Sequence, residues 1–147
     1  MQQKEEVLLV EDERAWQREL KRILEEGGYA VRVVDNYEDA VRVLKEHAVK
    51  VAVVDVSLNP GDAYDRQGLA VMAEAGLPVV CVSGYLGEEE VKALLRDGKA
   101  EWFFAKQSFA GKEKRFLDAV GYSLVVARHE ISERWRIIEH HLLARGD

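Results

Sequence analysis

Short apolar runs alternate with amphipathic stretches along the first 105 residues of this chain. Apolar runs of a few residues, bordered by turn-forming residues, indicate buried strands. Only residues 29–34 alternate in part between apolar and polar side chains, so most of these strands have both faces covered. The predicted strands are residues 7–10, 29–34, 49–58, 77–82 and 101–105.

Apolar residues at helical spacing fill the gaps between these runs. Gly27-Gly28 ends the first helical stripe, and Asp35 or Asn36 is the expected cap of the second helix. The predicted helical segments are residues 15–24, 40–48, 69–75 and 88–96, with a long helix over Lys112–Arg145 after the last strand.

The repeated alternation of strand and helix predicts an α/β fold with a parallel sheet. We expect one five-stranded parallel sheet with helices on both faces. This is a flavodoxin-like (βα)5 arrangement, here with an extended C-terminal helix. The length of 147 residues fits one domain with a short appendage.

Polar residues gather where the predicted strands end. Asp55 has no partner within its own run, so it lies at the open end of the strand or is paired from elsewhere, because burying an unpaired carboxylate is costly. Acids after the first strand either suit a helix N-terminus or need a cation between them. The residues at the strand ends are Glu11, Asp12, Glu13, Asp55, Ser83 and Lys106.

Because ligands of open α/β sheets bind at the carboxyl ends of the strands, these side chains form one candidate site. Carboxylates with phosphate oxygens are typical ligands of Mg²⁺. Asp55 is a candidate nucleophile that forms an acyl phosphate. Ser83 and Lys106 are placed to stabilise charge on the phosphoryl oxygens. The set indicates phosphoryl transfer with Mg²⁺ as the cofactor.

On these residues the chain resembles the receiver domain of two-component response regulators. The matching motifs lie in residues 7–13, 53–58, 83–84 and 103–106, and the resemblance covers about residues 7–127. It implies that Asp55 accepts a phosphoryl group from a sensor histidine kinase or a phosphotransfer protein. It also implies that Asp12 binds Mg²⁺ directly, Glu11 binds it through water, and the Ser57 carbonyl completes the protein ligands, beside Asp55.

The same resemblance assigns the switch. Ser83 would hydrogen-bond the phosphoryl group and move toward it, while Lys106 would pair with it. Phe103 would be the aromatic residue that swings inward on activation, and Gly84 would keep access to Asp55 open. The implied catalysis is limited to self-catalysed phosphorylation and dephosphorylation, so the protein is not expected to be an enzyme in any wider sense.

Two features depart from the family pattern. Gln107 stands where the family usually has proline, so we expect a trans Lys106–Gln107 bond and a reshaped loop, because a cis bond would cost about 2.5–4 kcal/mol. Residues 59–67 form a longer loop before Gly68, the glycine expected to open the third helix. Three functional roles are open for this loop: a lid, a segment that alters phosphate lifetime, or a replacement for part of a partner interface. The alternative is a tolerated insertion without a function of its own.

The chain divides into a receiver over residues 1–127 and a helical extension over residues 128–147. Apolar residues near a three-four spacing run from Leu117 to Leu142, interrupted at Arg134. We favour a homodimer through this helix. The alternative is a helix that folds back over its own domain. His140-His141 indicate a solvated terminus and not a metal site, because adjacent helical side chains point apart.

Charge and composition limit the classes of partner that this chain is expected to bind. A net charge of −6 and a pI near 5.3 argue against nucleic acid, and no run approaches the length of a membrane span. Cys81 is the single cysteine, so no internal disulfide forms and a cytoplasmic location is expected. Output then comes through a downstream protein target.

Two functions remain, a phosphorylatable switch and a pseudo-receiver that acts as a constitutive interaction or dimerisation module. A phosphatase acting on small molecules would need an acid two residues after Asp55, where Ser57 stands.

Overall fold

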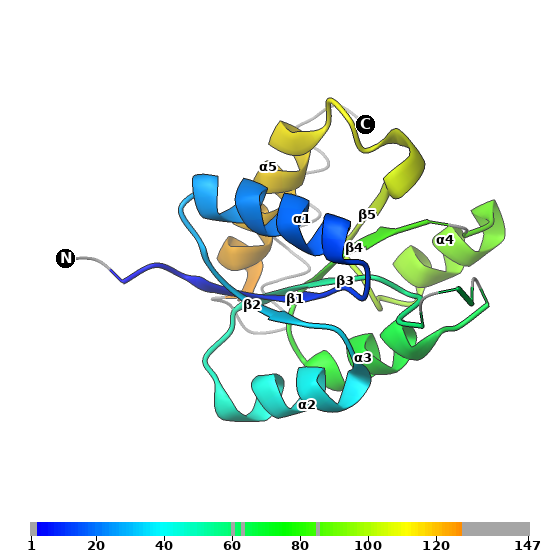
Figure 1. Cartoon of the computed structure of the whole chain (residues 1–147), viewed down its shortest axis with the longest axis horizontal. Helices are drawn as coiled ribbons and strands as arrows, with labels where there is room; N and C mark the ends of the chain where they lie inside the picture. The colour runs from blue at the N-terminus through cyan, green and yellow to red at the C-terminus, as the bar shows by residue number, and fades with distance from the viewer. Residues whose placement is uncertain (1–2, 60, 63, 85, 128–147) are drawn as a thin grey trace.

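The structure, a computed structural model, describes residues 3–59, 61–62, 64–84 and 86–127. Five strands form one parallel sheet in the order β2-β1-β3-β4-β5, which confirms the predicted α/β architecture (Figure 1). The strands are β1 (Glu6–Val10), β2 (Ala30–Val34), β3 (Val51–Val54), β4 (Val79–Ser83) and β5 (Trp102–Ala105).

Helices α1 and α5 pack on one face of this sheet, and α2, α3 and α4 cover the other (Figure 1). A short 3₁₀ helix, η1 (Lys106–Ser108), follows β5 directly. Helices on both faces are the expected partners of a parallel sheet, because each crossover returns over one face. The helices are α1 (Arg14–Glu26), α2 (Tyr37–Glu46), α3 (Gln67–Ala75), α4 (Glu88–Arg96) and α5 (Glu113–Ala127).

Alternate strand residues enter two separate hydrophobic cores. Val7 and Leu9 of β1 join the core under α1 and α5, while Leu8 and Val10 join the core under α2, α3 and α4. Successive side chains of a strand point to opposite faces, so a run that is apolar at every position fills both cores. The central strand β3 is fully buried along its whole length.

The ends of the helices resolve two open points of the sequence. Asn36, and not Asp35, caps α2, because its side-chain oxygen accepts a hydrogen bond from the Asp39 amide at 2.8 Å. Glu13 is the N-terminal boundary residue of α1 but makes no capping bond with its side chain, and the first turn of α1 contains no acid. The acids after β1 therefore precede the helix and do not line its first turn.

The predicted third strand, residues 49–58, is too long, since β3 ends at Val54. Beyond it the start of α3 takes over the backbone partners: the Gly68 amide donates to the Val56 carbonyl at 2.8 Å. A β-carbon on Gly68 would lie 1.9 Å from the Asp55 carbonyl oxygen, so only glycine allows this approach. The predicted role of Gly68 as the opening glycine of α3 is confirmed, and Asp55 lies just past its strand.

The predicted C-terminal helix is described as α5 as far as Ala127, and it continues through Gly121 without a break. The extension over residues 128–147, with its expected dimer interface, lies outside the described residues. In the part of the chain that the structure describes, no helix combines the length and the apolar character needed to cross a membrane.

Candidate functional site

The candidate site is built at the carboxyl ends of four strands. Glu11, Asp12 and Glu13 follow β1, Asp55 follows β3, Ser83 ends β4 and Lys106 follows β5. Parallel strands bring these ends to one edge of the sheet. One oxygen from each of the four carboxylates lies within 4.8 Å of the others. The structure thus brings together the residues that the sequence placed at separate strand ends.

Asp55 is paired through both carboxylate oxygens. The Ser83 hydroxyl donates to Oδ1 at 2.6 Å, and the Lys106 ammonium donates to Oδ2 at 2.7 Å. The Ser57 amide also donates to Oδ1, at 3.3 Å. With only 5% of Asp55 exposed, these donors supply the compensation that a buried carboxylate requires.

Lys106 lies at the centre of the charges. Its Nζ is 2.6 Å from Glu11 Oε1 and 3.3 Å from Glu13 Oε1, in addition to its contact with Asp55. The ring centroid of Trp16 lies 5.2 Å from the same Nζ. The described backbone contains no cis peptide bond, so the trans bond expected between Lys106 and Gln107 is confirmed. Lys106 opens η1 and contacts Asp55 although no proline follows it.

Burial shapes the charge states of this cluster. Burial and the nearby Asp55 charge raise the pKa of Glu11 to about 9, although the Lys106 ammonium works in the opposite direction. For Lys106, burial alone would lower the pKa, but the charges of Asp55 and Glu11 outweigh burial and raise it. Lys106 therefore keeps its positive charge in this site.

The acids at this edge fit a divalent cation. Asp12 Oδ1 is shielded from solvent and has no hydrogen-bond partner among the described residues. Burial raises the pKa of Asp12, since its charged form lacks full solvation. A cation would supply the missing partner, and oxygen donors of this kind suit Mg²⁺. The Ser57 hydroxyl donates to the Asp62 carbonyl at 2.9 Å and so does not join the carboxylate cluster.

The two predicted switch residues differ in their surroundings. Ser83 is buried and contacts Asp55 directly. Phe103 is partly buried against the core under α2, α3 and α4. A β-carbon on Gly84 would meet only ordinary van der Waals contacts, the nearest at 3.6 Å from Gln107 Nε2. The predicted access role of Gly84 therefore stays a prediction.

Sequence reasoning missed two residues that support the site from α1. Gln17 donates from Nε2 to the Glu11 carbonyl at 2.6 Å, and Trp16 lies over Lys106. The available signal was helical spacing, because Trp16 and Gln17 follow Glu13 by three and four residues at the start of α1. Glu13 was recognised as part of the acidic run, but its contact with Lys106 was not foreseen.

The loop after β3 is held by its own side chains. Asp65 Oδ2 accepts hydrogen bonds from the Leu58 amide at 2.8 Å and from the Gln67 amide at 3.2 Å. Arg66 forms an ion pair with Glu90 of α4, with Nε 3.0 Å from Oε2. The loop is thus tied both to itself and to the neighbouring helix.

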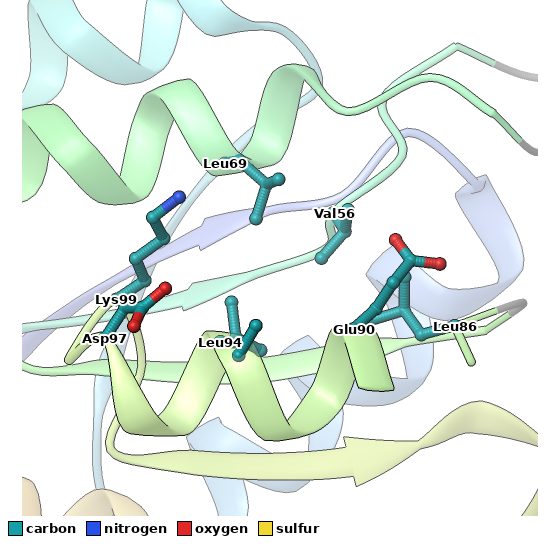
Figure 2. A pocket seen from close by; sticks show the side chains of 8 residues that line it. Val56, Leu69, Leu86, Glu90, Leu94, Asp97 and Lys99 are labelled. Carbon is teal, nitrogen blue, oxygen red and sulfur yellow. The ribbon is translucent and has the colours of Figure 1, made fainter. Parts of the chain in front are cut away.

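A small apolar cavity of about 140 Å³ opens between α3 and α4 (Figure 2). Leu69 and Leu94 face each other across it, and the buried Val56 and the exposed Glu90 also line it (Figure 2). None of the predicted site residues lines it. The cavity therefore borders the residue that follows Asp55 but does not form part of the carboxylate site.

Comparison with known proteins places this geometry in context. The sequence model of the family described as response regulator receiver domain matches residues 7–120. The response regulator protein FleR of Pseudomonas aeruginosa is 32% identical over 96 residues, which are 65% of this chain and 20% of FleR. An uncharacterized 14.6 kDa protein of Leptolyngbya boryana is 30% identical over 95 residues, 63% of this chain and 72% of that protein.

Solved structures agree with the sequence matches. The receiver domain of NtrX from Brucella abortus superposes with a TM-score of 0.67 at 27% identity, over 80% of this chain and 97% of that one. A CheY-like receiver domain protein from Methanospirillum hungatei superposes with a TM-score of 0.70 at 21% identity, over 86% and 98% of the two chains, which supports the fold alone. The chain spans about a fifth of FleR, so the remainder of that relative has no counterpart in the match.

Proposed function

Since this chain belongs to the response regulator receiver domain family, we propose that Asp55 accepts a phosphoryl group in a Mg²⁺-dependent reaction and that the domain signals through protein contacts. The carrying observation is the convergence of Ser83 Oγ and Lys106 Nζ on the two oxygens of Asp55. A hydroxyl and an ammonium fixed beside a nucleophilic carboxylate are placed to stabilise charge on a phosphoryl group that joins it.

In the proposed reaction, a carboxylate oxygen of Asp55 attacks the phosphorus of a phosphohistidine. A new O–P bond forms, the N–P bond breaks, and the electron pair returns to the imidazole nitrogen, which takes up a proton. Lys106 Nζ and Ser83 Oγ donate to the phosphoryl oxygens. Attack by water on phosphorus later restores the carboxylate and releases phosphate. The catalysis proposed for the chain extends no further than these two steps.

Asp12 and Glu11 would hold the cation, with Asp55 and the Ser57 carbonyl completing the protein ligands. Mg²⁺ would neutralise negative charge as the phosphoryl group approaches. Asp12 Oδ1 supports this assignment, because it is buried without a hydrogen-bond donor in the described part of the chain.

The donor would be a sensor histidine kinase or a phosphotransfer protein, and the output a downstream protein target. A cytoplasmic location and a homodimer through residues 128–147 remain predictions from the sequence. The activity of FleR as a whole is not transferred, because the match covers a fifth of its length.

A second candidate, the pseudo-receiver, is favoured by one observation. Lys106 contacts Asp55, Glu11 and Glu13, so a single ammonium bridges three of the acids. Such a closed network would hold the domain in one constitutive conformation. It would then serve as an interaction or dimerisation module without phosphorylation.

Beryllofluoride with Mg²⁺ distinguishes the two functions, because it mimics a phosphoryl group on a carboxylate. We expect binding to change the emission of Trp16, which lies 5.2 Å from Lys106 Nζ. Asp55→Asn should abolish the change, whereas Asp97→Asn, at an exposed acid beyond α4, should leave it intact. A wild-type protein that binds no beryllofluoride at millimolar Mg²⁺ would support the pseudo-receiver.

A further inference from the structure

Lys106 needs support from outside its own strand. It follows β5, the edge strand, yet its Nζ contacts Asp55, which follows β3 on the far side of β4 in the sheet. The segment that carries it, η1, is only three residues long. Among the described residues, the hydrogen-bond and ion-pair partners of Lys106 Nζ are carboxylates: Asp55, Glu11 at 2.6 Å and Glu13 at 3.3 Å. Any cation that binds these carboxylates competes directly with the contacts that hold the ammonium.

Trp16 contacts Lys106, the first residue of η1, and Phe109, the residue that follows η1. Its ring centroid lies 5.2 Å from Lys106 Nζ, within the range of a cation–π contact. The same ring packs edge-to-face on Phe109, with centroids 5.6 Å apart and planes at 80°. Phe109 directly follows η1, is buried to 97% of its surface (3% exposed), and its amide donates to the Lys106 carbonyl.

Phe109 is itself fixed in the core. It makes edge-to-face contacts with Phe104 of β5 at 6.1 Å and Phe116 of α5 at 5.5 Å. A row of rings therefore runs from the core to Trp16, and the ammonium of Lys106 lies at its end. Trp16 comes from α1, the helix that follows Glu11 and Glu13, so it links the acidic and the basic sides of the site.

We propose that Trp16 is a positioning residue for Lys106, holding the ammonium beside Asp55 when a divalent cation occupies the carboxylates. The inference rests on the proposed phosphoryl-acceptor function. An indole ring is neutral and does not ligate Mg²⁺, so its attraction for the ammonium persists when the acids that hold the ion, Glu11 among them, turn to the metal. The Phe109 contact keeps the ring in place while those carboxylates change partners.

Beryllofluoride affinity, followed by ¹⁹F NMR in the presence of Mg²⁺, tests the role without relying on Trp16 emission. We expect Trp16→Leu to weaken binding roughly three- to tenfold, the size of a partly buried cation–π contact. Trp16→Phe keeps an aromatic face and should lose clearly less. The matched control is Trp102→Leu, since Trp102 packs on Tyr122 of α5 and touches no site residue in the described contacts.

A spectroscopic readout separates positioning from simple packing. In the resting wild-type protein, the ring current of Trp16 should shift the ¹H signals of the Lys106 ε-methylene upfield of the other lysines. Trp16→Leu should remove this shift, while Trp102→Leu should leave it unchanged. Selective ¹³C labelling of lysine, with Lys106→Met to assign the signal, identifies the resonance.

Equal losses of affinity in Trp16→Leu and Trp16→Phe, or a Lys106 signal without an upfield shift, would overturn the proposal. If wild type binds no beryllofluoride, the proposed function fails, and the Lys106 signal alone then decides whether Trp16 holds the ammonium. A shift that persists in saturating Mg²⁺ supports the positioning role, and one that disappears on adding Mg²⁺ refutes it.

Discussion

Two clusters of the same chemical kind lie in very different surroundings. On α1, Arg22 stands between Glu19 and Glu26, with side chains 51%, 45% and 65% exposed. At the edge of the sheet, Lys106 stands between Glu11 and Asp55, with side chains 10%, 1% and 5% exposed. Each cluster places one cation between acids, and the two clusters differ sharply in their access to solvent.

That difference decides what each cluster can do. Exposed pairs in water gain little, because solvent screens the charges and the side chains lose freedom. When one partner of a buried pair is removed, the other charge stays in a low dielectric without compensation. The Arg22 cluster therefore contributes little to stability. In the Lys106 cluster, the charge balance depends on what binds there.

The largest effect should come from removing the buried cation. Lys106→Met should lower the free energy of unfolding by about 3–5 kcal/mol without divalent metal, because Glu11 and Asp55 lose their buried partner. Urea unfolding followed by circular dichroism measures it. Lys92→Met is the matched control, since Lys92 pairs with Glu88 and Glu89 on the surface of α4. Equal midpoints for the two variants would remove the distinction between the clusters.

Mg²⁺ should have the next largest effect. A cation bound only by the native state stabilises it by about 1.4 kcal/mol when its concentration is ten times its dissociation constant. Melting curves with increasing Mg²⁺ should therefore move upward in wild type and stay fixed in Asp12→Asn. Asp118→Asn, at an exposed acid of α5, should respond like wild type. A Mg²⁺ response that survives Asp12→Asn would place the ion elsewhere.

Asp65 lies between the two extremes, as a half-buried carboxylate with local partners. Burial would raise its pKa, but hydrogen bonds from the Leu58 and Gln67 amides outweigh burial and lower the pKa below its ordinary value of 3.8. A lowered native pKa means that the stabilisation is present above pH 3.8 and is lost as the pH falls through the native pKa.

Hydrogen exchange at the Leu58 amide reads out this contact, because that amide donates directly to Asp65. Protection should be present near pH 6 and weaken below pH 4, and Asp65→Ala should remove it at both values. Glu46→Ala, at an exposed acid ending α2, serves as the control. Protection that persists in Asp65→Ala would mean that the loop is held by other contacts.

The smallest effect should come from the exposed cluster. Arg22→Met should leave the unfolding midpoint close to that of wild type, because all three side chains of the cluster are already solvated. Urea unfolding at low and high NaCl should show any residual difference shrinking as salt screens the charges. A destabilisation as large as that of Lys106→Met would show that burial is not what separates the two clusters.

The sequence predicted the elements of this fold well, because runs that are apolar at every position leave little choice. β1 and β4 fill two cores at once, and a half-exposed strand does not have such a pattern. The end of β3 was misplaced because the apolar run continues through Val56, while the partner beyond Val54 is the start of α3. Such a change of partner depends on tertiary contacts.

The candidate site was predictable as a set of strand ends but not as a network. Parallel topology alone brings Asp55, Ser83 and Lys106 to one edge of the sheet. The sequence does not show that Lys106 also reaches Glu13, or that Trp16 covers it, because these contacts depend on where α1 lies over the sheet. The sequence therefore identified the site residues at the strand ends and missed those that α1 brings to the site, Trp16 and Gln17.

The order of these charges along the chain has a consequence for biosynthesis. The four carboxylates are all translated by residue 55, and the lysine that pairs with Asp55 follows 51 residues later. Domains emerge from the ribosome amino end first. A nascent sheet of β2, β1 and β3 would crowd acids together with no lysine to balance them. We expect ribosome-bound chains halted before Trp102 to stay sensitive to protease, so that the edge strand completes the domain and its charge balance in a single step.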